Sequence, residues 1–133
     1  MSGPWTAGQV VIAAGQPYST IIDTNGYHFL GLRMPAAMDG TSFTVYAFGA
    51  PGASADDSKA LADATAALGA GPGTFQEVFD ATGAAVGPIV FAAGTCVGID
   101  SKIMAALAGF RFLVLKSSVN ETAQRVIGYS LKA

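Results

Sequence analysis

Short apolar or alternating runs, separated by Gly, Pro, Asn and Asp, make up most of this chain. In residues 41–48, Phe43, Val45 and Ala47 alternate with Thr44, Tyr46 and Phe48, the period-two pattern of a half-buried strand. Such runs predict about eight strands, at 9–13, 18–23, 27–34, 41–48, 75–80, 85–92, 110–118 and 124–132. Their spacing favours an all-β fold, an antiparallel β-sandwich.

For two pairs of these runs, the sequence predicts that the two strands are neighbours in a sheet. Ala81, Thr82 and Gly83 separate 75–80 from 85–92, so these runs are expected to form a hairpin. The two C-terminal runs are both rich in β-branched and aromatic residues, and a polar segment lies between them. We therefore expect 110–118 and 124–132 to be neighbouring strands of one sheet.

Two segments break the strand pattern and predict one or two short helices. Residues 54–69 are rich in alanine, begin with Ser54 or Asp56 as an N-cap and end at Gly69. They fit a helix of about three turns or an irregular exposed excursion. The second helix is predicted at 100–109 and turns three apolar side chains inward, those of Ile103, Met104 and Leu107.

Length and composition narrow the class of protein. The 133 residues suffice for one sandwich domain, which we place at 9–133 with an N-terminal arm at 1–8 and an Ala-rich excursion at 50–73. Charged residues make up 12% and hydrophobic residues 51%, so the protein is expected to bury further surface in an assembly. The most apolar window, 84–99, is interrupted by Gly87-Pro88, so no membrane span is predicted. The net charge of −2 argues against nucleic acid as a partner.

Few side chains offer reactive chemistry, and each has a simpler structural interpretation. His28 is the only histidine and lies within a predicted strand, where a strand-face position is simpler than a metal or catalytic role. Cys96 stands in an apolar stretch and is expected to be buried and inert. Asp56, Asp57 and Asp63 can gather a cation if their segment is a loop, but an acidic helix start is simpler. We predict no enzyme activity, no cofactor and no metal site.

Two arginines open the C-terminal strands. Arg111 and Arg125 can bind a carboxylate or a sugar hydroxyl. Pairing with carboxylates such as Asp80 or Glu121 at the sheet margin is the simpler expectation.

Five segments share a motif order with known proteins. They read YHFLGLRMPA at 27–36, DGTSFTV at 39–45, TFQEVFDATG at 74–83, GFRFLVLKS at 109–117 and QRVI at 124–127. Together they resemble a family of small tailed-bacteriophage virion proteins. The resemblance implies a jelly-roll or discoidin-like β-sandwich that serves as a capsid decoration (cement) or head-spike protein.

The resemblance also implies partners and a location. The partners would be the major capsid protein or other virion proteins, and the chain would form a homo-oligomer, with a trimer favoured. The protein would be made in the host cytoplasm and reside in the virion, on the capsid surface. Discoidin-type sugar-binding domains carry a similar aromatic-Arg-aliphatic strand. They imply the alternative of a carbohydrate- or receptor-binding module in a head spike or tail fibre, with a surface glycan held near Tyr18, Tyr27 or His28.

Four residues are candidates for an interface with such partners. Pro4 and Trp5 lie in the arm, outside any predicted strand, and an exposed Trp is a natural anchor. Trp5 can instead fold back as a lid on the sandwich. Arg33 and Arg111, each at one end of a predicted strand, complete the set.

Overall fold

The protein is described by a computed structural model that covers residues 5–24, 27, 29–49, 75–99, 101–107 and 109–132. Several predictions lie outside these residues: the helix or loop at 54–69 within the excursion 50–73, and the positions of Pro4, His28, Asp56, Asp57 and Asp63. They stay predictions.

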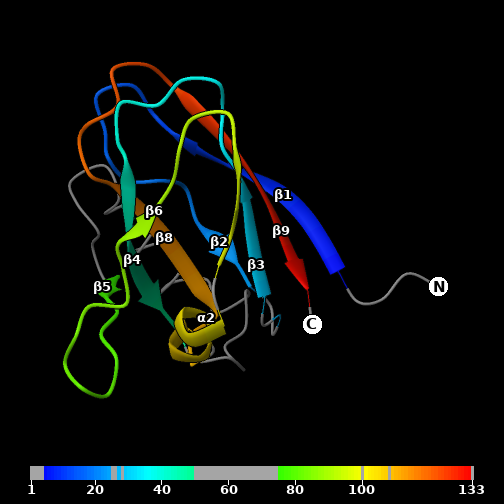
Figure 1. Ribbon diagram of the computed structural model, residues 1–133, viewed down its shortest axis with the longest axis vertical. Coiled ribbons are helices and arrows are strands. Elements are labelled where there is room, and N and C mark those ends of the chain that lie inside the picture. Colours follow the sequence, from blue (N-terminus) through cyan, green and yellow to red (C-terminus); the bar gives the residue numbers. More distant parts are fainter. Residues whose placement is uncertain are drawn as a thin grey trace.

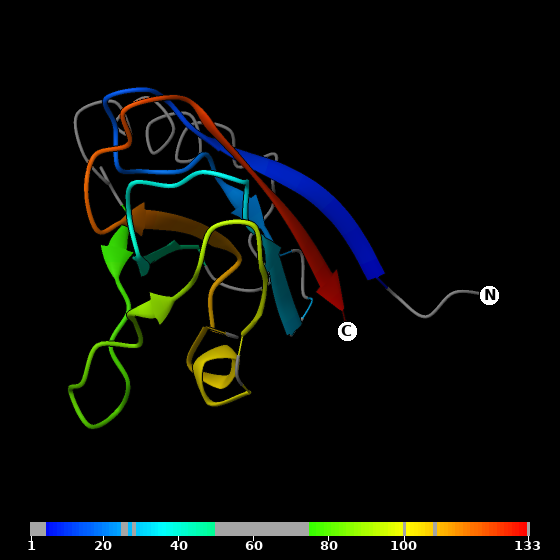
Figure 2. The same ribbon diagram turned by 45° about the horizontal axis from the view of Figure 1, so that its top comes forward.

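Two antiparallel sheets face each other and form a β-sandwich, as the sequence predicts (Figures 1 and 2). The four-stranded sheet has the order β1-β9-β3-β7, with β1 (Trp5–Ile12), β9 (Arg125–Lys132), β3 (Phe29–Arg33) and β7 (Cys96–Gly98). The five-stranded sheet has the order β2-β8-β4-β5, and β6 also pairs with β4. Its strands are β2 (Ile22–Asp23), β8 (Phe112–Ser117), β4 (Ser42–Phe48), β5 (Gln76–Glu77) and β6 (Ile89–Val90).

The alternation that predicts the strand at 41–48 is confirmed in β4. Phe43, Val45 and Ala47 are buried, and the residues between them are only partly buried. Because successive side chains of a strand point to opposite faces, this pattern turns one face of β4 toward the core.

The first strand begins earlier than predicted, at Trp5 rather than at residue 9. All of β1 pairs with β9, from Trp5 opposite Lys132 to Ile12 opposite Arg125. Residues 5–8 of the predicted arm therefore belong to the sheet. Ala and Gly have low strand propensity, so only the distant partner strand reveals this part of β1.

The prediction that the two C-terminal strands are neighbours in one sheet is wrong. β8 pairs with β2 and β4, whereas β9 pairs with β1 and β3 in the opposite sheet. The connection between them crosses from one sheet to the other. The two strands have similar compositions, and composition does not show which sheet a strand joins.

The predicted hairpin at 75–92 forms only near its turn. Phe79 bridges Ala85, but β5 and β6 both pair with β4, one after the other along the same edge. The residues between them project as a loop from that edge (Figure 1).

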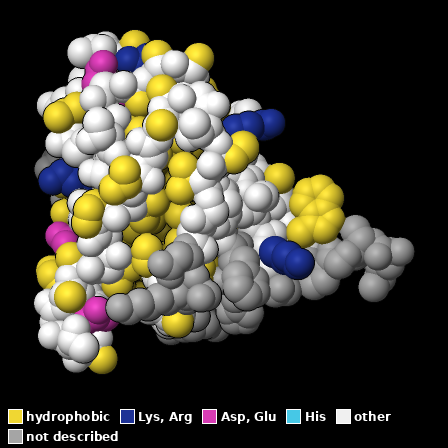
Figure 3. All heavy atoms as spheres, in the orientation of Figure 1, with side chains coloured by type: hydrophobic (Ala, Val, Ile, Leu, Met, Phe, Trp, Pro, Cys, Tyr) yellow, Lys and Arg dark blue, Asp and Glu magenta, His cyan; other side chains and the backbone are white. Residues whose placement is uncertain are grey.

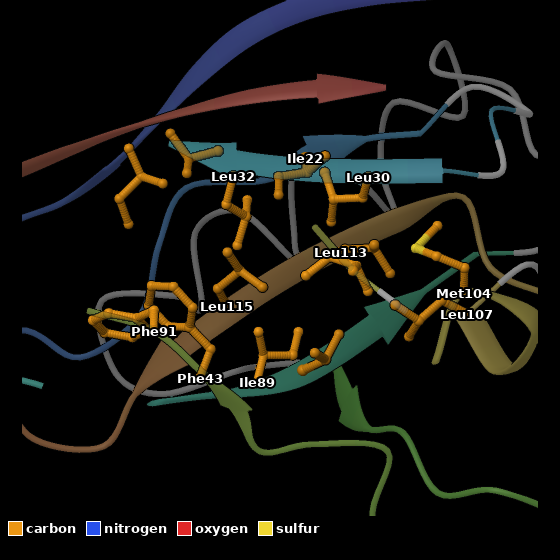
Figure 4. Packing of buried hydrophobic residues seen from close by; sticks show 14 of the residues in the cluster. Ile22, Leu30, Leu32, Phe43, Ile89, Phe91, Met104, Leu107, Leu113 and Leu115 are labelled. Atoms are coloured by element: carbon orange, nitrogen blue, oxygen red, sulfur yellow. The ribbon is translucent and has the colours of Figure 1, made fainter. Parts of the chain in front are cut away.

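The core lies between the sheets. Figure 4 shows Leu30 and Leu32 of β3 facing Leu113, Leu115 and Phe43 across the sandwich. Ile22 of β2, which pairs with Leu113 in the five-stranded sheet, is also buried in this core. The helix α2 (Ser101–Leu107) closes one end, where Met104 and Leu107 are buried and Ile103 packs against the core. The inward side of this predicted helix is thus confirmed.

A second apolar cluster lies on the five-stranded sheet. Phe75, Phe112 and Val114 are buried there, and Tyr46 and Phe48 pack against them. In β4 and β8 these side chains alternate with the core-facing residues, so this part of the outward face of the sheet carries a buried apolar cluster. The outward face of the four-stranded sheet is different and carries the candidate site.

Candidate functional site

The outward face of the four-stranded sheet is formed by residues that alternate with the core positions. The strand registers align them in rows across the sheet. One row runs Gln9, Gly128, Arg33, Cys96, and the next runs Ala7, Ser130, Gly31, Gly98. A third row places Trp5 beside Lys132. We call this surface the outer face.

The middle row forms the floor of an open hollow of about 700 Å³. Four of the lining residues are glycines, namely Gly8, Gly31, Gly98 and Gly128. Because glycine has no side chain, the sheet backbone itself is accessible there, and Gln9, Arg33 and Cys96 of one flanking row line one side of the hollow. The flanking rows are four residues apart along each strand, or about 14 Å.

These glycines differ in how closely other side chains approach them. A Cβ on Gly128 would lie 3.5 Å from Nε of Arg33, so the arginine side chain lies along this glycine. A Cβ on Gly8 would lie 2.6 Å from the hydroxyl of Tyr129, whose ring covers Gly8 on the other side of the strand. Gly98 has open space around it.

The outer face is basic. Its charged residues, among those that the structure describes, are Arg33 and Lys132, and the described positions include no Asp or Glu. The side chain of Arg33 is exposed and forms no hydrogen bond or ion pair with the described part of the chain. Figure 3 shows hydrophobic and basic side chains at the protruding right-hand end, while the acidic side chains in view lie on the left. Such a surface attracts an acidic partner.

The structure brings two of the predicted interface residues onto this face. Trp5 is 58% exposed and occupies the same side of β1 as Ala7 and Gln9. Arg33 lies on the same face, two strands away. The alternative that Trp5 forms a lid over the sandwich does not fit its exposure or its place in β1.

The prediction that Cys96 is buried is wrong. Cys96 is exposed on the outer face, directly opposite Arg33. The cause is β7, a three-residue edge strand that the sequence pattern does not predict and that turns Val97 inward and Cys96 outward.

Arg111, the fourth candidate, lies in the other sheet region and binds a carboxylate. Its Nε donates to Oδ1 of Asp23 at 2.8 Å and its Nη2 to Oδ2 at 2.9 Å. Its guanidinium also lies 5.1 Å from the ring centroid of Phe112. This bidentate geometry ties the start of β8 to β2, which gives Arg111 a structural role.

A buried carboxylate joins the sheets at the other end. Glu121 is fully buried, and its oxygens accept hydrogen bonds from Asp39 N, Gly40 N, Ser117 Oγ and Arg125 Nε at 2.8 to 3.1 Å. The expected pair of Arg125 with Glu121 is thus confirmed. Burial raises the pKa of Glu121, but these hydrogen bonds outweigh it and leave the pKa below its usual value. We call this set the Glu121 cluster.

The pKa of Asp39 is also below its usual value. The main cause is the backbone N–H of Thr122, with a smaller contribution from Arg125. Asp39 therefore supports the Glu121 cluster as a carboxylate rather than as an acid or base.

Within the described residues, no three His, Cys, Asp or Glu side chains gather as metal ligands. No helix in the described part is long and apolar enough to cross a membrane.

Comparison with known proteins supports the fold. No protein-family model and no curated protein matches the sequence. Among solved structures, the chain is similar to the SPBc2 prophage-derived protein YomS, with a TM-score of 0.50 and 10% sequence identity. The match covers 98% of this chain and 96% of that protein. At this identity the likeness shows a shared fold over nearly the whole chain.

Sequence reasoning missed most of the outer face. The sequence pattern does not mark Gly31, Gly98, Ser130 or Lys132 as site residues. The first three are small residues, which in strands are read as weak strand formers. A signal was present in β3 and β9, where glycine interrupts strong strand sequences. Isolated glycines in strands often mark a close approach of another molecule.

Proposed function

We propose that this chain is a non-enzymatic structural protein of a phage virion, specifically a capsid decoration (cement) protein. In this proposal the outer face docks on an acidic surface of the major capsid protein or of another virion protein. The observation that carries the proposal is the contrast between the two sheets: the outward face of one carries a buried apolar cluster, while the other is open, basic and free of acidic residues in the described part.

Two further findings support a structural role. The shared fold with a prophage-derived protein over nearly the whole chain is compatible with a phage origin. Several described acidic and basic side chains form ion pairs that hold the sandwich together, as Arg111 does with Asp23 and Arg125 with Asp39 and Glu121. These groups stabilise the fold and are not arranged around an open pocket as catalytic groups would be.

The test begins with particles of the phage that encodes the chain. Heads and tails are purified separately and analysed by quantitative mass spectrometry. The proposal expects the chain in full heads, in a fixed ratio to the major capsid protein. Its absence from heads would refute the decoration role, and its presence in tails alone would favour a tail component.

A second experiment tests the docking surface. Heads that lack the chain are mixed with purified protein, and binding is followed by co-sedimentation at rising salt. Arg33→Glu should abolish most binding because it leaves Lys132 opposed by a carboxylate and so cancels the net positive charge of the outer face. Lys116→Glu is the matched control, since it makes the same charge change on the five-stranded sheet. Equal losses for the two variants would refute docking through the outer face.

One observation favours the alternative of a carbohydrate- or receptor-binding module. Gln9, Ser130 and Arg33 place polar groups around the hollow, and Trp5 stands in the flanking row. Sugar sites commonly combine such groups with an exposed aromatic ring. Saturable binding on a glycan array, lost in Trp5→Ala, together with absence from capsids, would favour this alternative.

A further inference from the structure

One edge of the four-stranded sheet is open. β1 is the outermost strand of that sheet, beside β9, and β1 begins and β9 ends at the protruding end of the molecule (Figures 1 and 2). Near its C-terminal end β1 has a second neighbour: Val11 N donates to Thr20 Oγ1 at 3.0 Å and Thr20 N donates to Val11 O at 2.9 Å. These bonds establish which backbone groups of β1 point away from β9.

The backbone N–H and C=O groups of successive residues in a strand point to opposite edges, so every second residue before Val11 points its groups to the same edge. These residues are Gln9, Ala7 and Trp5. Their N–H and C=O groups point away from β9, as those of Val11 do. Unlike Val11, they have no backbone or side-chain partner within the described residues. The open edge therefore offers three residues with unpaired donors and acceptors, placed symmetrically about Ala7.

The open edge also lacks the usual protection against pairing. Natural edge strands carry charged residues, prolines or bulges that discourage another strand. The sequence of β1, WTAGQVVI, contains no charged residue and no proline. Its register with β9 is continuous over the whole strand, without a bulge.

We propose that a second copy of this chain pairs its own β1 with this edge, antiparallel and about a two-fold axis at Ala7. Trp5 then pairs with Gln9 of the second copy, and Ala7 with Ala7. These three pairs make about six backbone hydrogen bonds, two for each hydrogen-bonded pair. The two four-stranded sheets become one continuous sheet, and the two outer faces lie on the same side.

The side chains favour a second copy over an unrelated strand. Residues that pair across antiparallel strands share a face, so Trp5 would lie on the outer face beside Gln9 of the second copy. Next in that row come Gly128, which has no side chain, and Arg33, which lies along Gly128. Beyond Gln9, Trp5 therefore meets no larger side chain before the Arg33 guanidinium, a favourable cation–π partner. The exposed indole of one copy completes the hollow of the other.

This inference goes beyond the proposed function and can be tested on the purified chain, whether or not the chain enters a virion. It also differs from the trimer that the family resemblance implies. A two-fold pair uses both open edges and closes at two copies, whereas a trimer requires a different contact.

The first experiment compares Ala7→Pro with Ala7→Val by analytical ultracentrifugation over a range of concentrations. The N–H of Ala7 points away from β9, so proline removes no bond within the chain, and edge strands tolerate proline at such positions. Loss of the central pair should weaken association about 100-fold in Ala7→Pro. Ala7→Val keeps the N–H and should remain a dimer. A monomeric or trimeric wild type, or equal masses for the two variants, would overturn the proposal.

The second experiment remains decisive even if Ala7→Pro fails to fold. The only cysteine is removed by Cys96→Ser, and Ala7→Cys is added. A short bis-maleimide should then link two chains rapidly, because the two thiols face each other across the axis. The matched control places the new cysteine at Val90, which is 70% exposed on the opposite sheet. Equally slow linking at both positions would overturn the proposal.

Discussion

Replacement of Glu121 by glutamine should sharply destabilise the protein. The change keeps the shape of the side chain but removes its charge. The carboxylate now accepts from four donors, two at each oxygen: Asp39 N and Arg125 Nε at Oε1, and Gly40 N and Ser117 Oγ at Oε2. In Glu121→Gln an amide NH₂ must occupy one of these places and face donors.

The size of the loss follows from these contacts. The hydroxyl of Ser117 can rotate and accept, but the N–H of Gly40 or of Asp39 cannot. At least one backbone donor therefore loses its acceptor inside the protein, which costs about 1–3 kcal/mol. The remaining bonds lose the assistance of a full charge, about 1 kcal/mol more. The sum is about 3 kcal/mol, or a fall in Tm of roughly 10 °C for a domain of this size.

The assay is urea unfolding at pH 7 followed by circular dichroism, with Glu77→Gln as the matched control. Glu77 is partly exposed on β5, so the control should change the free energy of unfolding by less than about 0.5 kcal/mol. A loss below about 1 kcal/mol in Glu121→Gln would refute the view that the Glu121 cluster holds the sheets together.

The same pair of proteins gives a pH prediction. The folded pKa of Glu121 is lower than its unfolded pKa, which is about 4.3. Its stabilisation is therefore fully present above the unfolded pKa and is lost as pH falls through the folded pKa. The difference in stability between wild type and Glu121→Gln should shrink as pH falls below about 4. A constant difference from pH 7 to pH 3 would contradict the lowered pKa.

Three further predictions follow from packing and exposure. Gly40→Ala should lower the free energy of unfolding by about 2 kcal/mol or more, because its Cβ would lie 2.0 Å from Ser117 Oγ. Gly98 has open space around it, so Gly98→Ala should stay within about 0.5 kcal/mol of wild type in the same urea assay. Leu115→Ala should lower the free energy of unfolding by about 3 kcal/mol, since removal of this fully buried side chain leaves a cavity between the sheets. Cys96 should react with a thiol reagent in the folded protein at a rate that denaturant does not raise, and protection would contradict its exposure.

The candidate site shows where local patterns reach their limit. Trp5 and Arg33 could be chosen from the sequence because tryptophan and arginine are residue types that often anchor interfaces. Their common face could not be chosen, because it depends on β1 and β3 both pairing with β9. The exposure of Cys96 depends in the same way on the register of β7 with β3.

The sequence by itself determined the fold class and several core positions. Alternation in β4 and the inward residues of α2 are local periodicities, and each is legible within a few neighbouring residues. The tertiary structure decided which strands are neighbours. It separated β8 from β9, extended β1 to Trp5 and left one edge of that strand open. The physical reason is that strand pairing joins backbone groups far apart in the chain, and backbone groups are the same in every sequence.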